Sequence, residues 1–392
     1  MRSLPGKIAG AIILLLIASS VLFGGSIVPA AERPDLYLPL LKGKRIALVV
    51  NHSSLTKGKH LVDFLLAKQI RVRKIFAPEH GFRGTADAGE HLKSGIDPKT
   101  NLPIISLYGK HKKPSKRDLA GIDLIVFDIQ DVGVRFYTYL STLHYVMEAA
   151  AENHIPLIVL DRPNPNGHYV DGPVLKRKYR SFVGLDPVPV VYGMTIGEYA
   201  KMLNGEGWLK GGLRAKLTVV PLSGYTHRSL YSLPVKPSPN LPNDRAIALY
   251  PSLAFFEGTV FSAGRGTTKQ FQLYGAPEYT IKRFSFTPRS MPGARYPKFK
   301  GKRCWGVDLS RKSVASIRAE KRLNLSYLLD AYQHDPQKRK FFLKNHFIDR
   351  LAGSDQLRRQ ILAGKNEAEI RKSWQTDLAT FRKIRAKYLL YP

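Results

Sequence analysis

A glutamate inside a short Pro-Glu-His-Gly stretch is the first candidate for chemistry in this sequence. Glu79 follows Pro78 directly after an apolar run, where a rigid turn can hold a carboxyl group at the rim of a cleft. The glycine after His80 leaves room for a ligand to come close. A carboxyl group in this setting suits a general acid, and a structural ion pair between Glu79 and Arg83 accounts for the same residues equally well.

Cleavage of a glycoside usually requires a second carboxylate, and the sequence offers several. One carboxylic acid protonates the leaving oxygen, while the other acts as base or nucleophile. A sugar with a 2-acetamido group provides a different route, in which its own amide oxygen attacks and a single protein acid suffices. The candidates for the second carboxylate are Asp128, Asp131, Asp161, Asp171 and Glu257.

Metal, thiol and serine chemistry find less support. The histidines at 52, 80, 91 and 168 follow no H-E-x-x-H or other standard zinc spacing. Cys304 is the only cysteine, so the chain has no C-x-x-C pair and no internal disulfide. No G-x-S-x-G motif is present. We therefore expect neither a metal nor a cofactor.

Five short apolar runs in the first half predict the strands that position these residues. They cover residues 45–50, 72–76, 103–107, 123–128 and 156–160. Helix-like segments at 61–69 and 141–153 alternate with them, which indicates an α/β fold with a parallel, Rossmann-like sheet. No G-x-G-x-x-G follows the first run, so a dinucleotide site is not expected.

A polar cluster follows each of the five runs. Because ligands of open α/β sheets bind at the carboxyl ends of the strands, we expect these clusters to meet in one crevice. The clusters occupy residues 51–52, 77–81, 108–109, 129–133 and 161–165.

The N-terminal sequence predicts an exported protein, and the length of the chain predicts two domains. Arg2 and Lys7 precede an apolar run over residues 8–23, and small residues follow at Ala30 and Ala31. This order predicts a signal peptide over residues 1–31, and an uncleaved membrane anchor is the alternative. We expect a periplasmic or extracellular protein with a Rossmann-like domain at 32–171 and a smaller α+β domain at 172–392.

The net charge is strongly positive. The sequence has 62 Lys and Arg against 30 Asp and Glu, which gives +32. Such a field attracts acidic polymers, which predicts an electrostatic association with anionic envelope polymers, and a merely solvated basic surface is the alternative. We expect no nucleic-acid partner, because no nucleic-acid-binding motif is present.

Eight stretches together resemble the exo-β-N-acetylmuramidase (NamZ-like) family, formerly a domain of unknown function. They are residues 78–81, 128–139, 160–165, 181–184, 193–198, 237–240, 256–259 and 264–267. The resemblance extends from about Lys44 to the C-terminus and implies a cleft between the two domains. It also implies release of N-acetylmuramic acid from the non-reducing end of peptidoglycan fragments, by hydrolysis of the β-1,4 bond to N-acetylglucosamine.

Three positions depart from the pattern of some relatives. This chain has Asp171 and Ala263 where those relatives have Glu, and Tyr192 where they have His. Because the ionisable groups of those relatives are absent at 192 and 263, we expect no essential catalytic role at these two positions. A non-catalytic protein that binds cell-wall glycan or muropeptides is the alternative function.

The hypothesis assigns Glu79 as general acid and Asp131 or Asp171 as the second carboxylate. Arg265 could bind the lactyl carboxylate of muramic acid, because arginine recognises carboxylates in a bidentate manner, and a loop arginine that binds backbone carbonyls is the alternative. We expect substrate contacts from Asn51, His80, Arg83, Tyr108, Arg135, Tyr137, Asp161, Arg162, Asn164, Asn240, Glu257 and Arg265.

Overall fold

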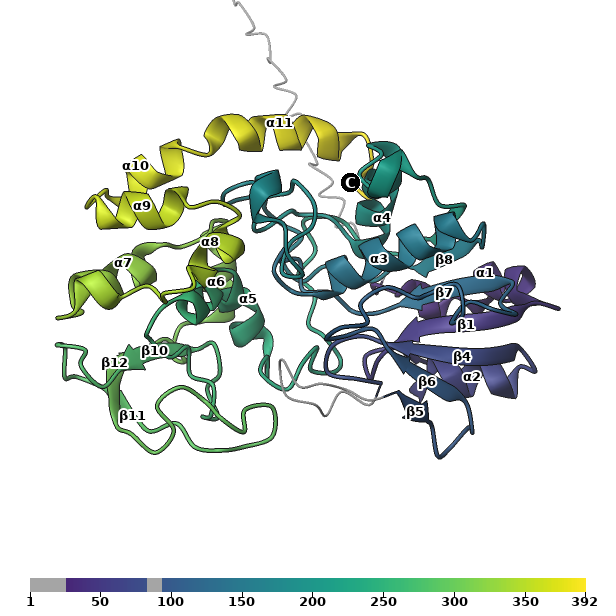
Figure 1. The fold of residues 1–392 in the computed structure, drawn as a ribbon, viewed down its shortest axis with the longest axis horizontal. Coiled ribbons are helices and arrows are strands. Elements are labelled where there is room, and N and C mark those ends of the chain that lie inside the picture. Colours follow the sequence, from purple (N-terminus) through teal and green to yellow (C-terminus); the bar gives the residue numbers. More distant parts are fainter. Residues whose placement is uncertain (1–25, 83–93) are drawn as a thin grey trace, which may run out of the picture.

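A seven-stranded sheet forms the centre of the first domain in the computed structural model, which describes residues 26–82 and 94–392 (Figure 1). The strand order is β5-β6-β4-β1-β7-β8-β9, and only β5 runs antiparallel to its neighbour. The five predicted strands are confirmed as β1 (Arg45–Val50), β4 (Arg71–Ala77), β6 (Pro103–Ser106), β7 (Leu124–Asp128) and β8 (Leu157–Leu160). The two further strands are β5 (Gly95–Ile96) and β9 (Leu217–Val220).

Helices cover both faces of this sheet, which explains why its central strands are apolar throughout. On one face, Ala47 and Val49 of β1 share a core with α3 (Tyr139–Glu152) and α4 (Ile196–Gly205). On the other face, Ile46 and Leu48 pack with α1 (Pro34–Leu41) and α2 (Leu61–Ala67). The predicted α/β fold with a parallel, Rossmann-like sheet is therefore confirmed.

The second domain combines a small antiparallel sheet with short helices. Its strand order is β10-β12-β11, with β10 at Leu273–Ala276, β12 at Cys304–Asp308 and β11 at Ser285–Phe286. The helices are α5 (Asp244–Leu253), α6 (Val314–Ala319), α7 (Ser326–Gln333), α8 (Phe347–Ala352), α9 (Gln356–Leu362) and α10 (Glu367–Lys372). This composition agrees with the predicted smaller α+β domain.

Strand β9 lies in the large sheet, whereas we expected it in a second domain that begins at residue 172. It pairs in parallel with β8, from Leu157 opposite Leu217 to Leu160 opposite Val220. Helix α4 provides the crossover that returns the chain to the sheet edge. β9 lies at the edge of the sheet, where it is short and partly exposed. Its sequence therefore resembles that of a short strand outside the sheet.

The N-terminal segment before α1 is built into the first domain. Val28 forms an antiparallel bridge with Ser223, and the Ala30 N–H donates to the carbonyl of Asp161 over 3.0 Å. Ala30 and Ala31 are fully buried, and the Ala31 carbonyl accepts a hydrogen bond from the Tyr37 hydroxyl at 3.0 Å. Cleavage after residue 31 would remove Val28, Ala30 and Ala31 and, with them, these contacts.

The last helix, α11 (Gln375–Ala386), runs from the second domain back to the first (Figure 1). Asp377 pairs with Lys176, and the Arg385 guanidinium donates to the carbonyl of Gly193. The chain then ends beside α4, where Glu198 accepts the backbone N–H of Leu390 at 2.8 Å. Within residues 26–82 and 94–392, no helix has the length and apolar character needed to cross a membrane.

Candidate active site

A cleft of about 810 Å³ lies between the carboxyl end of the sheet and the second domain. Its first wall comes from the segments after β4 and β6 and from the start of α3. Its opposite wall comes from the segment around Glu257 and from α8. The sequence-predicted residues that line the cleft are Glu79, His80, Tyr108, Tyr137, Asn240, Glu257 and Arg265.

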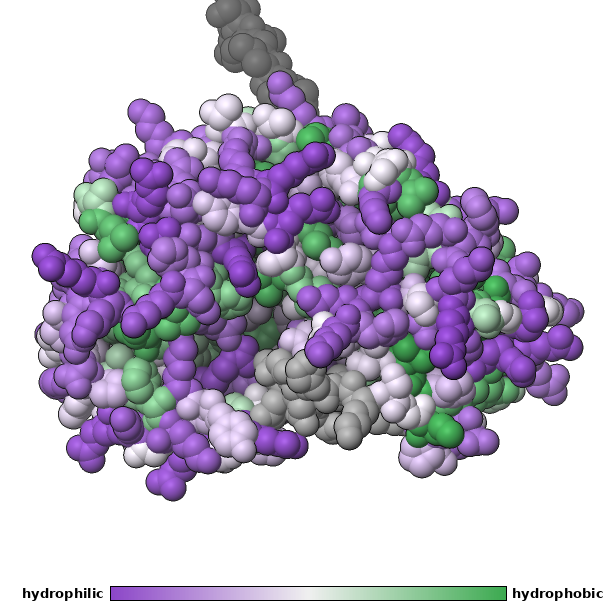
Figure 2. Space-filling model, in the orientation of Figure 1, coloured by the Kyte–Doolittle hydropathy of each residue, from purple (hydrophilic) through white to green (hydrophobic). Residues whose placement is uncertain are grey.

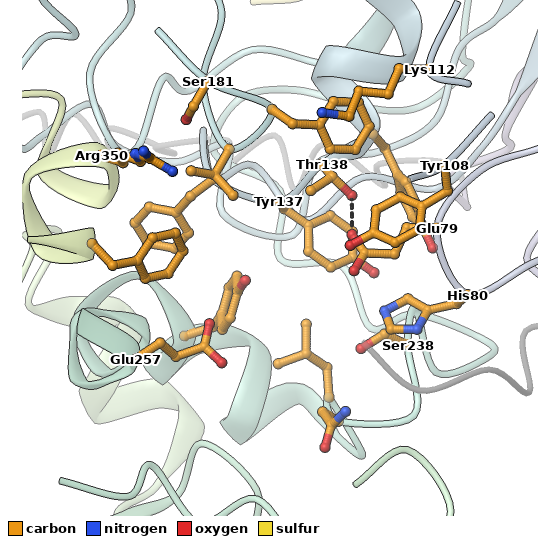
Figure 3. Close-up of a pocket in the computed structure, with 18 of the residues that line it drawn as sticks. Glu79, His80, Tyr108, Lys112, Tyr137, Thr138, Ser181, Ser238, Glu257 and Arg350 are labelled. Carbon is orange, nitrogen blue, oxygen red and sulfur yellow. Dashed lines mark hydrogen bonds between the residues drawn. The ribbon is translucent and has the colours of Figure 1, made fainter. Parts of the chain in front are cut away.

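Glu79 stands in a tight turn directly after β4. The Gly81 N–H donates to the carbonyl of Pro78 over 2.9 Å, and both His80 (φ 67°) and Gly81 (φ 77°) are left-handed. A positive φ is uncommon for residues other than glycine, and such strained positions cluster at functional sites. The Thr138 hydroxyl, just before α3, donates to Glu79 Oε2 over 2.6 Å (Figure 3). The carboxyl group is thus held at the cleft wall.

Glu257 is the acid on the opposite wall. It belongs to a 3-10 helix, η4 (Ala254–Gly258), and its Oε1 accepts a 2.7 Å hydrogen bond from Arg265 Nε. The guanidinium of Arg265 in turn lies 5.0 Å from the ring centre of Phe271. Figure 3 shows the carboxyl groups of Glu79 and Glu257 directed into the same cavity from opposite sides. Of the five candidates for a second carboxylate, Glu257 is the one that lines the cleft.

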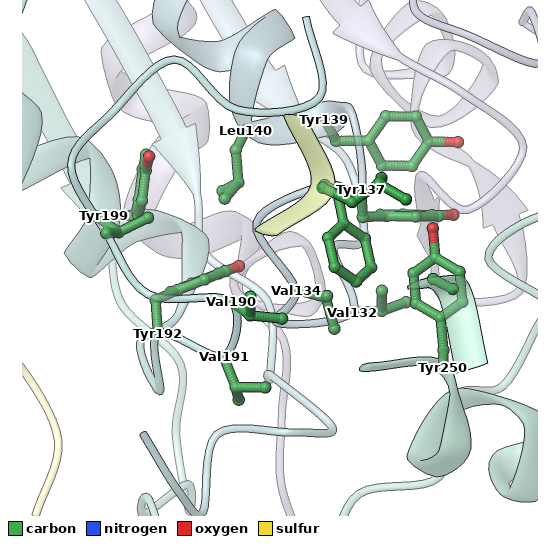
Figure 4. Packing of buried hydrophobic residues seen from close by; sticks show 14 of the residues in the cluster. Val132, Val134, Tyr137, Tyr139, Leu140, Val190, Val191, Tyr192, Tyr199 and Tyr250 are labelled. Carbon is green, nitrogen blue, oxygen red and sulfur yellow. The ribbon is translucent and has the colours of Figure 1, made fainter. Parts of the chain in front are cut away.

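Aromatic side chains form the floor between the two acids. Tyr137 contacts Tyr139 edge-on at 4.7 Å between ring centres and Tyr250 at 6.0 Å (Figure 4). The Tyr137 hydroxyl donates to the carbonyl of Pro237 over 2.8 Å. Burial raises the pKa of Tyr137, Tyr139 and Tyr250, so their hydroxyl groups stay protonated. Such rings offer stacking surfaces and hydrogen bonds to a sugar.

In the described part of the chain, four cationic side chains line the cleft in addition to Arg265. Sequence reasoning missed all of them, since none belongs to a motif with an obvious chemical role. Lys112 follows the third predicted strand, so its place after a strand end was the one available signal. The four are Lys112, Lys178, Arg180 and Arg350.

Asp131 does not line the cleft and is buried behind its floor. Its Oδ2 accepts hydrogen bonds from the Tyr192 hydroxyl and from the Gly133 N–H at 2.6 Å. Burial raises the pKa of Asp131 to about 7, although these hydrogen bonds act in the opposite direction. The structure therefore gives Asp131 no direct access to a ligand in the cleft.

Asp171 serves to join the two domains. Its Oδ2 accepts a hydrogen bond from Arg371 of α10 and from the Leu323 N–H, both at 2.7 Å. The side chain is buried and is absent from the cleft lining. The structure therefore places Asp171, which we predicted as a second catalytic carboxylate, outside the cleft, because its carboxylate is paired with segments of the second domain.

Asp161 and Arg162 also face the protein interior. Asp161 accepts hydrogen bonds from the hydroxyls of Thr195 at 2.7 Å and Tyr391 at 2.6 Å. Arg162 forms a bidentate ion pair with Asp128, with distances of 2.5 and 2.8 Å. Both were predicted to bind substrate, but the polar cluster after β8 has its partners within the fold.

Three other predicted contacts are buried and support the cleft from behind. The Asn51 amide donates to the Tyr139 hydroxyl over 2.9 Å, and that of Asn164 donates to the carbonyl of Met194. Arg135 donates to the carbonyls of Pro173, Val188 and Leu351. These residues do not line the cavity, and Arg83 lies outside the described residues.

No metal site is apparent in the described part of the chain. No group of three or more His, Cys, Asp or Glu side chains there has the arrangement of a metal site. His52 and His168 each contact a backbone carbonyl instead. Burial lowers the pKa of both histidines.

Two family models match the chain. The N-terminal model of exo-β-N-acetylmuramidase NamZ covers residues 46–245, and the C-terminal model covers residues 248–391. The peptidoglycan β-N-acetylmuramidase NamZ of Bacillus subtilis (strain 168) is 41% identical over 382 residues, which are 91% of this chain and 89% of that protein. The chain belongs to the exo-β-N-acetylmuramidase NamZ family.

Two crystal structures of DUF1343 family proteins from Bacteroides fragilis have the same fold. For the first, the TM-score is 0.87 and the sequence identity is 47%, and the match covers 94% of this chain and 99% of that protein's chain. For the second, the TM-score is 0.76 and the sequence identity is 30%, and the match covers 93% of this chain and 99% of that protein's chain. The two NamZ models meet near the start of α5, so the Glu79 wall belongs to the N-terminal model and the Glu257 wall to the C-terminal one.

Proposed function

We propose that this protein is an exo-acting glycoside hydrolase that releases N-acetylmuramic acid from the non-reducing end of peptidoglycan fragments. Membership of the NamZ family and 41% identity with a peptidoglycan β-N-acetylmuramidase support the reaction and the substrate class. The observation that carries the mechanism is the pair Glu79 and Glu257, which face each other across one cleft (Figure 3). Two carboxyl groups that flank the scissile bond are what most glycosidases use.

Glu79 acts as the general acid in this mechanism. Its carboxyl group sits on a rigid turn that lines the cleft, and the Thr138 hydroxyl fixes its orientation by donating to Oε2. In the first step, this proton passes to the glycosidic oxygen as the bond from that oxygen to the anomeric carbon breaks. N-acetylglucosamine, or the glycan chain that carries it, is the leaving group.

Glu257 acts on the opposite face of the sugar ring. Arg265 and the Glu257 carboxylate are joined at 2.7 Å, so the carboxylate has one fixed orientation and one oxygen available to the substrate. It assists the attacking group, which is a water molecule or the 2-acetamido oxygen of the sugar. The Tyr137 and Tyr250 rings between the two acids provide the surface on which the sugar lies.

The decisive experiment compares Glu79→Gln with the unaltered protein on a chromogenic β-N-acetylmuramide. We expect kcat to fall by at least about 100-fold, because general acid catalysis contributes that much or more. Glu278→Gln is the matched control, since Glu278 is exposed and does not line the cleft. Full activity of a correctly folded Glu79→Gln variant would contradict the assignment. Tight binding of muropeptides without any release of sugar would favour a binding protein instead.

We also propose that the protein is exported and that any signal cleavage occurs before Val28. The charged, apolar and small-residue order of residues 1–31 supports export. The burial of Ala30 and Ala31 supports a cleavage site further upstream. Mass spectrometry of the mature N-terminus tests this, and a first residue after Val28 would contradict it.

An electrostatic association with anionic envelope polymers is a further part of this proposal. The net charge of +32 supports it, and Figure 2 shows hydrophilic side chains over most of the face in view. Binding to an anionic wall polymer should weaken steeply between about 50 and 200 mM salt, because counterions screen exposed charges. Sedimentation with purified walls measures this, and salt-independent binding would contradict it.

A further inference from the structure

The cleft has an excess of positive charge that the catalytic pair does not explain. Among the residues that the structure describes, five cationic side chains line it, against the two carboxylates of Glu79 and Glu257. Arg265 is already paired with Glu257 at 2.7 Å. A substrate without a negative charge would gain no electrostatic attraction from the other four cations.

The four remaining cations differ in how they are engaged. Lys112 and Lys178 lie over the rings of Phe182 and Tyr179, each at 5.0 Å from the ring centre. Arg180 is 4.0 Å from Asp186. Arg350 has no ion pair or hydrogen bond with any other described residue, and its guanidinium points into the cavity (Figure 3).

Arg350 is held in a fixed relation to Glu257. Both come from the second domain, where α8 packs directly against η4. A side chain at Gly258 would meet the backbone of Ile348 at 2.6 Å, so the glycine allows the two segments to touch. The neighbouring Asp349 forms a bidentate pair with Arg358 at 2.9 Å, which fixes α8 from its other side.

We infer that Arg350 binds the lactyl carboxylate of N-acetylmuramic acid and thereby selects this sugar over N-acetylglucosamine. The inference rests on the proposed function and names the residue that recognises the substrate's lactyl group. The two sugars differ only in the lactyl ether at O3, whose carboxylate is a suitable partner for a guanidinium fork. From the sequence we assigned this role to Arg265, but the Arg265 guanidinium already forms an ion pair with Glu257.

The other cations contribute less specifically. Lys112 and Lys178 are point charges that raise the local potential and attract an anionic sugar into the cleft. They impose no bidentate geometry on a carboxylate. Arg180 is drawn towards Asp186, which is buried and also pairs with His144 at 2.9 Å. Arg350 is therefore the residue on which discrimination depends.

The test measures kcat/KM on three chromogenic substrates, which are the β-N-acetylmuramide, its lactyl methyl ester and the matching β-N-acetylglucosaminide. We expect kcat/KM of the unaltered protein to be about 30-fold higher on the free acid than on the ester, since hydrogen bonds to a charged group contribute about this much to binding. Arg350→Ala should lose this preference and the preference over the glucosaminide. Arg350→Lys should recover part of it, because the charge remains while the fork is lost.

Lys344→Ala is the matched control, as it removes an exposed cation shortly before α8 and outside the cleft. It should retain the preference for the free acid in full. If Arg350→Ala lowers kcat/KM on acid and ester by the same factor, the inference is wrong and the residue acts on the fold. Release of no sugar by the unaltered protein would instead refute the proposed function. Calorimetric titration with N-acetylmuramic acid checks the same preference without turnover.

Discussion

At the scale of single residues, similar polar clusters have different roles. Glu79 and Asp161 both follow a strand of the same parallel sheet. The first lines the cleft, whereas the second accepts hydrogen bonds from Thr195 and Tyr391 inside the fold. What separates them is their place in the fold, because the Asp161 carboxylate is fully buried and must be satisfied by the protein, whereas the Glu79 carboxylate lines a cavity that a ligand can enter.

Arg162 provides a test of this distinction. Arg162→Met leaves the buried Asp128 without its partner, so we expect the free energy of unfolding to fall by about 3–5 kcal/mol. The folded fraction should keep its kcat, since Arg162 does not line the cleft. Urea denaturation and kinetics on the muramide measure both quantities.

The double variant Asp128→Leu/Arg162→Met is the control, because it removes both charges and should recover much of the lost stability. A large loss of kcat with unchanged unfolding would show that Arg162 contacts substrate after all.

At the scale of elements, a buried charge network joins α3 to the segments around it. His144 on α3 pairs with Glu148 at 3.1 Å and with Asp186 at 2.9 Å, and the Tyr199 hydroxyl of α4 also donates to Asp186. Lys113 completes the network at Glu148, over 3.2 Å. Because α3 begins at the cleft wall, this network keeps the start of the helix in place.

The network predicts a pH-dependent stability. Burial alone would lower the pKa of His144, but hydrogen bonds with Asp186 and Glu148 outweigh burial and raise it to about 9. This value lies above the ordinary 6.5, so the stabilisation is fully present below pH 6.5 and is lost as the pH rises through 9. The loss should be on the order of 3 kcal/mol at most.

The measurement compares urea unfolding of the unaltered protein and His144→Gln at pH 6.5 and 9.5. The stability difference between the two proteins should shrink at the higher pH. Asp131 and Asp161, whose pKa values burial raises to about 7, titrate in both proteins and cancel from the comparison. A difference that is constant with pH would contradict the assigned protonation.

At the scale of the whole molecule, the cleft exists only while the two domains keep their relative positions. Its walls come from both, and helix α11 with the tail that follows spans them (Figure 1). Tyr391 anchors the tail, because its hydroxyl donates to Asp161 at 2.6 Å and accepts from the Leu222 N–H at 2.9 Å. The end of the chain is thus part of the scaffold of the active site.

We expect Tyr391→Phe to lower the free energy of unfolding by about 1–3 kcal/mol, since two buried groups lose their hydrogen bond. Tyr388→Phe is the matched control, because that hydroxyl contacts Glu206 near the surface and should cost less than about 1 kcal/mol. Thermal and urea unfolding measure both variants. Equal stability losses would argue against the anchoring role of Tyr391.

The sequence by itself determined the α/β sheet, the family and the position of Glu79. Apolar runs such as those of β1 and β7 are local patterns, and the Pro-Glu-His-Gly turn follows one of them directly. Only the tertiary structure decided that Glu257 is the acid facing Glu79, that β9 completes the first sheet and that Arg350 lies in the cleft. Each of these facts depends on which segments, far apart in the chain, share an interior, and this is a property of packing rather than of local spacing.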